Sequence, residues 1–171
     1  MADLKRIIEA LLFTASEPLS LKAISQLLPE WSTEELKKAL FELVEEWRRL
    51  NLSFGLQEVG GGYQFRTFPE YSTWIRRLKK VVPIKLSQAA LETLAVVAWK
   101  QPISRGEIEE IRGVDSGHVL GVLLEKGLIK PVGRKEAPGR PLLYGTTEKF
   151  LEVFGLSSLK DLPSLKELEN L

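Results

Sequence analysis

The chain has 171 residues, of which 44% are hydrophobic and 27% charged, and its formal net charge is +1 at pH 7. These values are ordinary for a globular protein of one or two domains, and the near-neutral charge weakens any hypothesis of strong phosphate binding. The absence of cysteine excludes disulfides and thiol chemistry, and no apolar run approaches the roughly 20 residues of a membrane span, so we expect neither a signal peptide nor membrane insertion.

Two short helices are predicted at the start of the chain. The apolar residues between Leu4 and Leu12 recur at helical spacing and fall on one face of a helix. Pro18 ends this helix, because the residue before a proline avoids the helical region. Ser20 is placed to cap a second helix, which Pro29 stops.

A third helix and a hairpin follow. Ser32 and Glu35 have the spacing of a capping box, which opens a long apolar-striped helix. Two alternating runs, 56–59 and 63–67, then surround Gly60-Gly61-Gly62, whose glycines permit a tight hairpin turn. Three helices followed by a hairpin are the element order of a winged helix.

The second half of the chain repeats the first. Four pairs of similar residues are each separated by 84 positions: Pro18 and Pro102, Ser20 and Ser104, Ile24 and Ile108, and Leu27 and Ile111. Similarity at a fixed spacing indicates a duplicated structural unit. The second half is therefore expected to follow the same plan.

The helices of the second half carry their own start and stop signals. Ser87 is expected to cap the first of them, and Ser104 with Glu107 forms a second capping box. Gly113 is suited to end that helix, because glycine adopts the left-handed conformation of a helix end without strain.

A third helix of the second half is predicted to start at Asp115 or Ser116 and to end at Gly127. Strands are expected at 128–133 and 141–146, on either side of a polar loop. This is again the order of a winged helix.

One more helix is predicted after each hairpin. Pro69 opens the first of these helices, and Thr146 is expected to cap the other at 147–154. We therefore predict an α+β fold, mainly α, made of tandem winged helix-turn-helix domains. The expected parts are a first domain at 1–80, a linker at 81–86, a second domain at 87–156 and a tail at 157–171.

Catalytic residues are scarce. His118 is the only histidine, and it has no cysteine or second histidine with which to share a metal or a nucleophile. No glycine-rich phosphate loop of the Gly-Lys-Ser/Thr type is present. We expect a protein that is not an enzyme, with no catalytic residue, no metal site and no cofactor.

The two third helices are poorly suited to reading DNA bases. In a helix-turn-helix protein this helix enters the major groove and needs Arg, Lys, Asn or Gln toward the base edges. The first one carries five acids: Glu34, Glu35, Glu42, Glu45 and Glu46. The second is apolar nearly throughout 119–124, which favours burial against another protein.

The strongest basic cluster lies in and around the second wing: Lys130, Arg134, Lys135 and Arg140. Weak nucleic-acid contact is one interpretation, and ordinary solvation of a loop is the other. Four charges cannot support strong binding at physiological salt, so the second interpretation is favoured.

Several stretches are distinctive when taken together. The longest runs from Gly133 to Thr147 and contains Gly-Arg-Pro-Leu-Leu-Tyr-Gly-Thr-Thr. The others are Glu9–Phe13, Gly61–Thr67, Ser87–Ala95, Gln101–Arg105 and Ile111–Val114. From about residue 4 to residue 163 the chain resembles segregation and condensation protein B.

The resemblance implies tandem winged-helix domains in a prokaryotic cytoplasm. It also implies a homodimer formed mainly through the N-terminal domain. The implied partner is the kleisin, segregation and condensation protein A (ScpA), which bridges the heads of an SMC ATPase in a complex that compacts and segregates chromosomes. The implied location is the cytoplasm, with the nucleoid reached through the complex and at most weak, non-specific DNA contact.

The dimer candidates are aromatic residues of the apolar-rich segment 4–50, since buried aromatic side chains tend to dominate interfaces, and the partner candidates come from the third helix of the second half and the segment Gly133–Thr147. For the dimer they are Trp31, Phe41 and Trp47, although the spacing of Trp47 from Leu40, Leu43 and Val44 favours a core position for that residue. For the partner they are Val119, Val122, Leu123, Arg134, Pro138, Gly139, Arg140, Pro141 and Tyr144. Pro138-Gly139 is alternatively a simple wing turn.

A sequence-specific DNA-binding regulator is the rival function for a tandem winged-helix chain. It predicts site preference and a steep dependence of affinity on salt.

Overall fold

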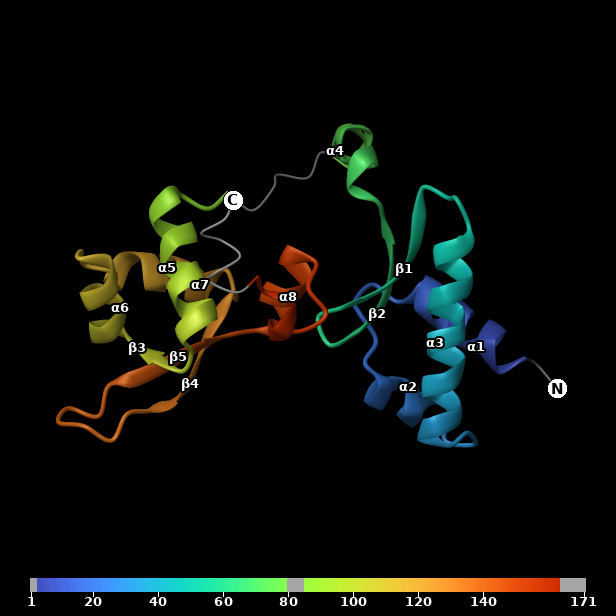
Figure 1. Ribbon diagram of the computed structural model, residues 1–171, viewed down its shortest axis with the longest axis horizontal. Helices are drawn as coiled ribbons and strands as arrows, with labels where there is room; N and C mark the ends of the chain where they lie inside the picture. The colour runs from blue at the N-terminus through green and yellow to red at the C-terminus, as the bar shows by residue number, and fades with distance from the viewer. Residues whose placement is uncertain (1–2, 80–84, 164–171) are drawn as a thin grey trace. The chain divides into compact units, whose positions relative to one another are not determined.

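The computed structural model describes residues 3–79 and 85–163, in two compact units. Unit 1 comprises the described residues up to 79 together with 155–163, and unit 2 comprises 85–154. Each is described by itself (Figure 1). The predicted linker at 81–86 falls mostly outside the described residues. No described helix is both long enough and apolar enough to cross a membrane.

Unit 1 begins with three helices and a hairpin, and most of the predicted start signals are confirmed. Its elements are α1 (Leu4–Thr14), α2 (Leu21–Leu27), α3 (Thr33–Arg49), β1 (Phe54–Val59), β2 (Gly62–Thr67), the 3-10 turn η1 (Pro69–Tyr71), α4 (Ser72–Lys79) and, within 155–163, the 3-10 turn η2 (Leu159–Asp161). The Ser20 hydroxyl accepts from the Ala23 N–H, and Ser32 and Glu35 form the capping box. These local bonds satisfy backbone donors that would otherwise lack a partner at each helix start.

The core of unit 1 lies where the three helices meet the hairpin. Its fully or almost fully buried side chains are Ile8, Leu12, Ile24, Leu36, Leu40, Leu43 and Leu56. They come from α1, α2, α3 and β1, so burial of this one cluster holds all four elements together.

The wing of unit 1 consists of two strands and a single β-bridge to the segment before α2. Strands β1 and β2 pair antiparallel in one continuous register, from Phe54 opposite Thr67 to Val59 opposite Gly62. On the far side of β2, Leu19 and Tyr63 exchange two main-chain hydrogen bonds of 3.0 and 2.9 Å.

Unit 2 repeats the plan. Its elements are α5 (Gln88–Lys100), β3 (Ile103–Ser104), α6 (Arg105–Arg112), α7 (Gly117–Glu125), β4 (Ile129–Arg134), β5 (Leu142–Thr146) and α8 (Glu148–Phe154). The three strands lie in the order β3-β5-β4. Ser87 and Ser104 cap α5 and α6 as predicted, and Gly113 ends α6 with φ of 70°.

Two details of unit 2 differ from the sequence prediction. The strand β3 was not predicted, because two residues give no periodic pattern. The sequence predicts Thr146 as the cap of α8, but the hydroxyl that accepts from the Phe150 N–H, at 3.1 Å, belongs to Thr147. The side chain of Thr146 is instead bonded to Gln101.

The duplication is visible in the strand pairing. Leu19 pairs with Tyr63 in unit 1, and Ile103, which lies 84 positions after Leu19, pairs with Tyr144 in unit 2. Both units are winged helices, and the fold is α+β and mainly α, as predicted.

Candidate protein interface

The outer side of α3 is the surface that a DNA-binding winged helix would present to the major groove. Here its charges pair along the helix, Lys37 with Glu34 at 3.1 Å and Arg48 with Glu45 at 2.8 Å. Between them stands Phe41, whose side chain is 69% exposed. The helix therefore offers an apolar anchor among neutralised charges rather than groups that read bases.

The second dimer candidate, Trp47, packs inside unit 1. Its ring lies 4.7 Å from that of Phe65 and 5.4 Å from that of Phe54, and its indole N–H donates to a Glu9 carboxylate oxygen at 2.9 Å. Trp31 is half-buried against the same core. Of the three dimer candidates, Phe41 is thus the one with most of its surface available.

A second exposed apolar surface lies on η1 and α4, where the sequence predicts a helix but no interface. Tyr71, Trp74 and Leu78 are 38%, 63% and 81% exposed. Their spacing puts them on one side of the helical segment, and among the described elements α4 packs mainly against η1. The spacing was a usable signal, because the preceding helices and hairpin already complete a winged helix without this face.

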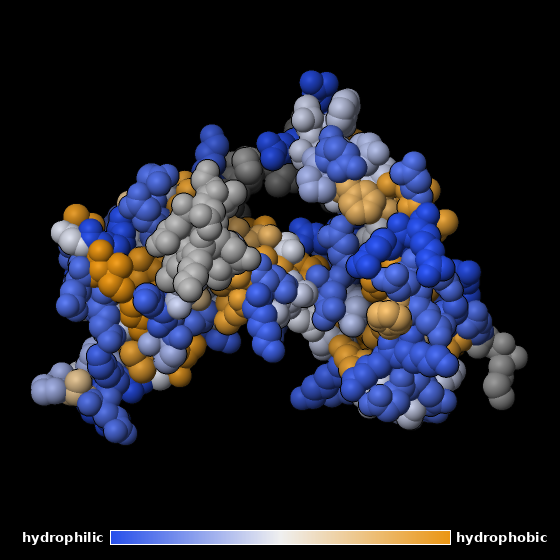
Figure 2. All heavy atoms as spheres, viewed as in Figure 1, coloured by the Kyte–Doolittle hydropathy of each residue, from blue (hydrophilic) through white to orange (hydrophobic). Residues whose placement is uncertain are grey.

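On the face that Figure 2 shows, hydrophilic residues cover most of unit 1, and hydrophobic residues reach the surface in separate places. Such a surface suits an interface built on a few apolar anchors within a polar rim.

Two of the four basic side chains predicted in the wing of unit 2 form hydrogen bonds within the protein. The Lys135 ammonium donates to Glu107 at 2.6 Å, and the Arg134 guanidinium donates to the Arg140 carbonyl at 3.0 Å. The pKa of Glu107 is lowered to about 2 by its bond to Lys135 and then by its bonds to Ser104. Lys135 therefore anchors the wing to the start of α6.

The remaining basic candidates, Lys130 and Arg140, have exposed side chains. With Lys135 and Arg134 engaged within the protein, the cluster offers phosphate less than its sequence suggests.

The partner candidates on α7 differ in accessibility. Val119 and Val122 are half-buried, so part of each side chain reaches solvent, whereas Leu123 is fully buried in unit 2. Leu123 therefore packs in the core of unit 2, and of these three residues only Val119 and Val122 can contact a partner directly.

The other partner candidates gather at the tip and on the strand of the unit 2 wing. Arg134, Pro138, Gly139 and Arg140 are exposed, and Pro141 and Tyr144 are half-buried. The Arg140 N–H donates to the Ala137 carbonyl, and Gly139 has φ of 80°. The Pro138-Gly139 pair therefore forms a wing turn, which presents its neighbours at the surface.

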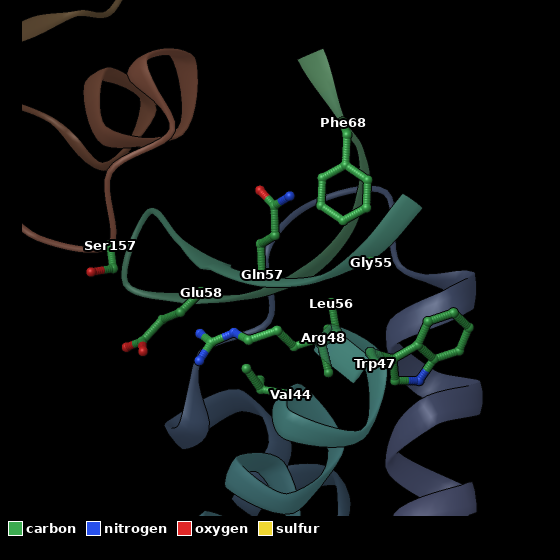
Figure 3. Close-up of a pocket in the computed structure, with 9 residues that line it drawn as sticks. All are labelled: Val44, Trp47, Arg48, Gly55, Leu56, Gln57, Glu58, Phe68 and Ser157. Atoms are coloured by element: carbon green, nitrogen blue, oxygen red, sulfur yellow. The ribbon is translucent and has the colours of Figure 1, made fainter. Parts of the chain in front are cut away.

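A groove of about 440 Å³ runs beside β1 in unit 1 (Figure 3). One wall comes from α3, through Val44, Trp47 and Arg48, and β1 lines it from Gly55 to Glu58. Phe68 and Ser157 complete the lining. Apolar and polar groups both face it, which suits a peptide better than a compact cofactor.

His118 is exposed near the start of α7. Within residues 3–79 and 85–163, no group of three or more histidine, aspartate or glutamate side chains is placed to hold a metal ion. The described residues therefore provide surfaces for protein contact, namely exposed apolar side chains, a groove of peptide size and the edges of the wings.

Comparison with known proteins gives a consistent result. The family model of segregation and condensation complex subunit ScpB matches residues 6–165. Segregation and condensation protein B of Syntrophotalea carbinolica is 50% identical over 99% of this chain and 85% of its own length. The protein of the same name from Carboxydothermus hydrogenoformans is 49% identical over 98% of this chain and 90% of its own.

Among solved structures, a dimer of the ScpB N-terminal domain complexed with an ScpA peptide is 37% identical, with a TM-score of 0.39. The matched region covers 43% of this chain and 91% of the chain in the solved structure.

Proposed function

The chain belongs to the family of segregation and condensation complex subunit ScpB, and we propose that it acts as a homodimeric, non-enzymatic subunit that binds the kleisin ScpA in an SMC–kleisin complex. Its role is then in chromosome condensation and segregation, in the cytoplasm and at the nucleoid through the complex. The observation that carries this proposal is the family match, which extends over nearly the whole chain at up to 50% identity.

The exposed apolar side chains of unit 1 support the dimer. Phe41 on α3, and Trp74 with Leu78 on α4, have large apolar side chains that are mostly exposed to solvent. Exposed apolar surface of this kind commonly marks a site of protein–protein contact. Buried aromatic side chains tend to dominate protein interfaces. We assign the dimer contact to Phe41 first, because this ring is 69% exposed on the outer side of α3.

The surface of unit 2 supports the kleisin contact. The exposed parts of Val119 and Val122, together with the wing tip around Pro138 and Arg140, are the surfaces on which we expect ScpA to lie. The engaged cations of this wing leave only weak, sequence-independent DNA contact. The SMC ATPase is then reached through the kleisin.

Light scattering on the full chain tests the proposal. We expect the mass of a dimer, and a heavier species when the middle segment of ScpA is added. Phe41→Ser should shift the dimer toward monomer by at least tenfold in dissociation constant, because a buried ring would be replaced by a small polar group. Lys37→Ser, one turn away on α3, is the matched control and should leave the dimer unchanged.

A monomer at every concentration would contradict the proposed homodimer. A Phe41→Ser protein as dimeric as the control would contradict the assignment of the dimer contact to Phe41. A chain that forms no complex with ScpA would remove the proposed function itself.

A further inference from the structure

No described strand lies beside the outer edge of β1, and the main-chain bond made on this side lies at the hairpin turn, where the Gly60 N–H donates to the Leu156 carbonyl at 3.0 Å. Tyr63 uses both its N–H and its carbonyl to bond Leu19, so its opposite residue on β1, Glu58, makes no main-chain bond across to it. Antiparallel pairs alternate between bonded and non-bonded types. The main-chain groups of Phe54 and Leu56 therefore also point away from β2, and no other described strand pairs with them.

The equivalent edge in unit 2 is blocked. Pro131 stands opposite Tyr144, and Tyr144 is paired with Ile103 on its other side. This is the same position that Glu58 occupies opposite Tyr63. Proline has no N–H to offer a neighbouring strand, and the register of β4 is also broken by a bulge between Pro131 and Gly133. Both features are known means of protecting a sheet edge from unwanted strand pairing.

The edge of β1 lacks such protection. Its sequence, FGLQEV, contains no proline, and its six residues pair one to one with β2 without a bulge. One chain thus carries two copies of the same wing. The edge in unit 2 is closed by Pro131, whereas in the described part of unit 1 the edge from Phe54 to Glu58 pairs with no further strand.

A recessed slot lies along the open edge. The 440 Å³ groove is lined by four consecutive β1 residues, from Gly55 to Glu58, with α3 on one side and Phe68 on the other. Val44, which is half-buried, supplies apolar side-chain surface within it. A volume of this size holds a few side chains of an extended peptide.

We propose that the edge of β1 binds an extended segment of the kleisin by β-strand addition, with an apolar side chain of that segment seated in the groove against Val44. The proposal rests on the proposed function for the identity of the partner. A free strand fits the recessed edge better than a second copy of this chain, whose β1 carries its own α3 and Phe68 alongside. In strand addition the main-chain bonds supply the affinity and the side-chain pockets supply the specificity.

Glu58→Pro tests the proposal, because it places a proline in β1 at the position equivalent to Pro131 of β4. The N–H that proline removes is not used by β2, and the preceding residue is already extended, as a residue before proline prefers. Glu58→Ala is the matched control, because it removes the carboxylate and keeps the N–H.

Titration of the full-length dimer with the middle segment of ScpA should show wild type and Glu58→Ala binding within about twofold of each other, and Glu58→Pro binding at least tenfold more weakly. Equal binding by all three overturns the strand-addition proposal and leaves the proposed function intact. No binding by wild type contradicts the proposed function instead. A Glu58→Pro protein that is monomeric by light scattering assigns the edge to a second copy and also overturns the proposal.

Amide hydrogen exchange on the wild-type complex gives an answer that does not depend on the folding of the proline variant. Binding of the ScpA segment should newly protect the N–H groups of Phe54, Leu56 and Glu58, while those of Gly55 and Gln57, already bonded to β2, change little. Unchanged exchange at the first three positions in the complex contradicts strand addition.

Discussion

Gly62→Ala should destabilise unit 1 because of a specific steric conflict. A Cβ atom at position 62 would lie 2.7 Å from the carbonyl carbon of Leu19, 2.8 Å from its oxygen and 2.9 Å from the nitrogen of Ser20. All three atoms belong to the backbone, so no side chain can rotate away. The chain before α2 must move, and the two main-chain bonds between Leu19 and Tyr63 are lost.

The size of the effect follows from those bonds. Each contributes about 0.5–1.5 kcal/mol, so with some residual strain the free energy of unfolding should fall by about 2–3 kcal/mol. For a unit of this size that corresponds to a drop in melting temperature of roughly 10–20 °C.

Fluorescence-detected urea unfolding measures this change in a full-length Trp99→Phe background, in which the remaining tryptophans, Trp31, Trp47 and Trp74, all lie in unit 1. Gly61→Ala is the neighbouring control. Its Cβ would meet nothing within 4 Å, and only its φ of 73° is unfavourable, so it should cost about 1 kcal/mol. If Gly62→Ala costs no more than Gly61→Ala, the close approach of Leu19 to the hairpin is not as described.

Three further changes have definite expected outcomes. The folded-state pKa of Glu107 is about 2, below its ordinary 4.5, so its bonds to Lys135 and Ser104 stabilise unit 2 above pH 4.5, and this contribution is lost as pH falls toward 2. Glu107→Gln should therefore flatten the pH dependence of the melting temperature over that interval, and an unchanged profile would contradict the assigned bonds. Trp47→Ala should lower the free energy of unfolding of unit 1 by about 3 kcal/mol in denaturant titration, because its ring packs against Phe65; a change below about 1 kcal/mol would show that it is not a packing residue. Gly106→Ala should raise the stability of unit 2 by about 0.5–1 kcal/mol, because the added methyl group meets nothing within 4 Å on α6; a loss of stability on calorimetry would argue against that helix position.

Helix starts were predictable because their signals are local. The Ser32 and Glu35 capping box involves residues three positions apart, and the structure contains both of its bonds. The same holds for Ser104 and Glu107. The repeat of 84 positions also predicted a second winged helix, because the duplicated sequence keeps the same turn residues.

Contacts between distant segments were not predictable from local patterns. Thr146 and Thr147 are equally good caps by sequence, and the choice is made by Gln101, which lies 45 residues away and bonds the Thr146 side chain. β3 exists only because β5 lies beside it. Such pairings have no periodicity within their own segment.

Exposure of the aromatic residues was likewise decided by packing between elements. Trp47 and Phe41 lie on the same helix, and the sequence offers both as anchors. Glu9 and Phe65 bury part of Trp47, whereas Phe41 remains 69% exposed. The open edge of β1 needed both the strand register and the protected edge at Pro131 to be recognised.

Calorimetric titration of the full-length chain at physiological salt, with the ScpA middle segment in one experiment and duplex DNA in another, tests the central claim most directly. The account predicts saturable binding of ScpA and, for DNA, only weak heat that disappears as salt is raised and does not depend on sequence. Tight, sequence-dependent DNA binding with no heat from ScpA would contradict it.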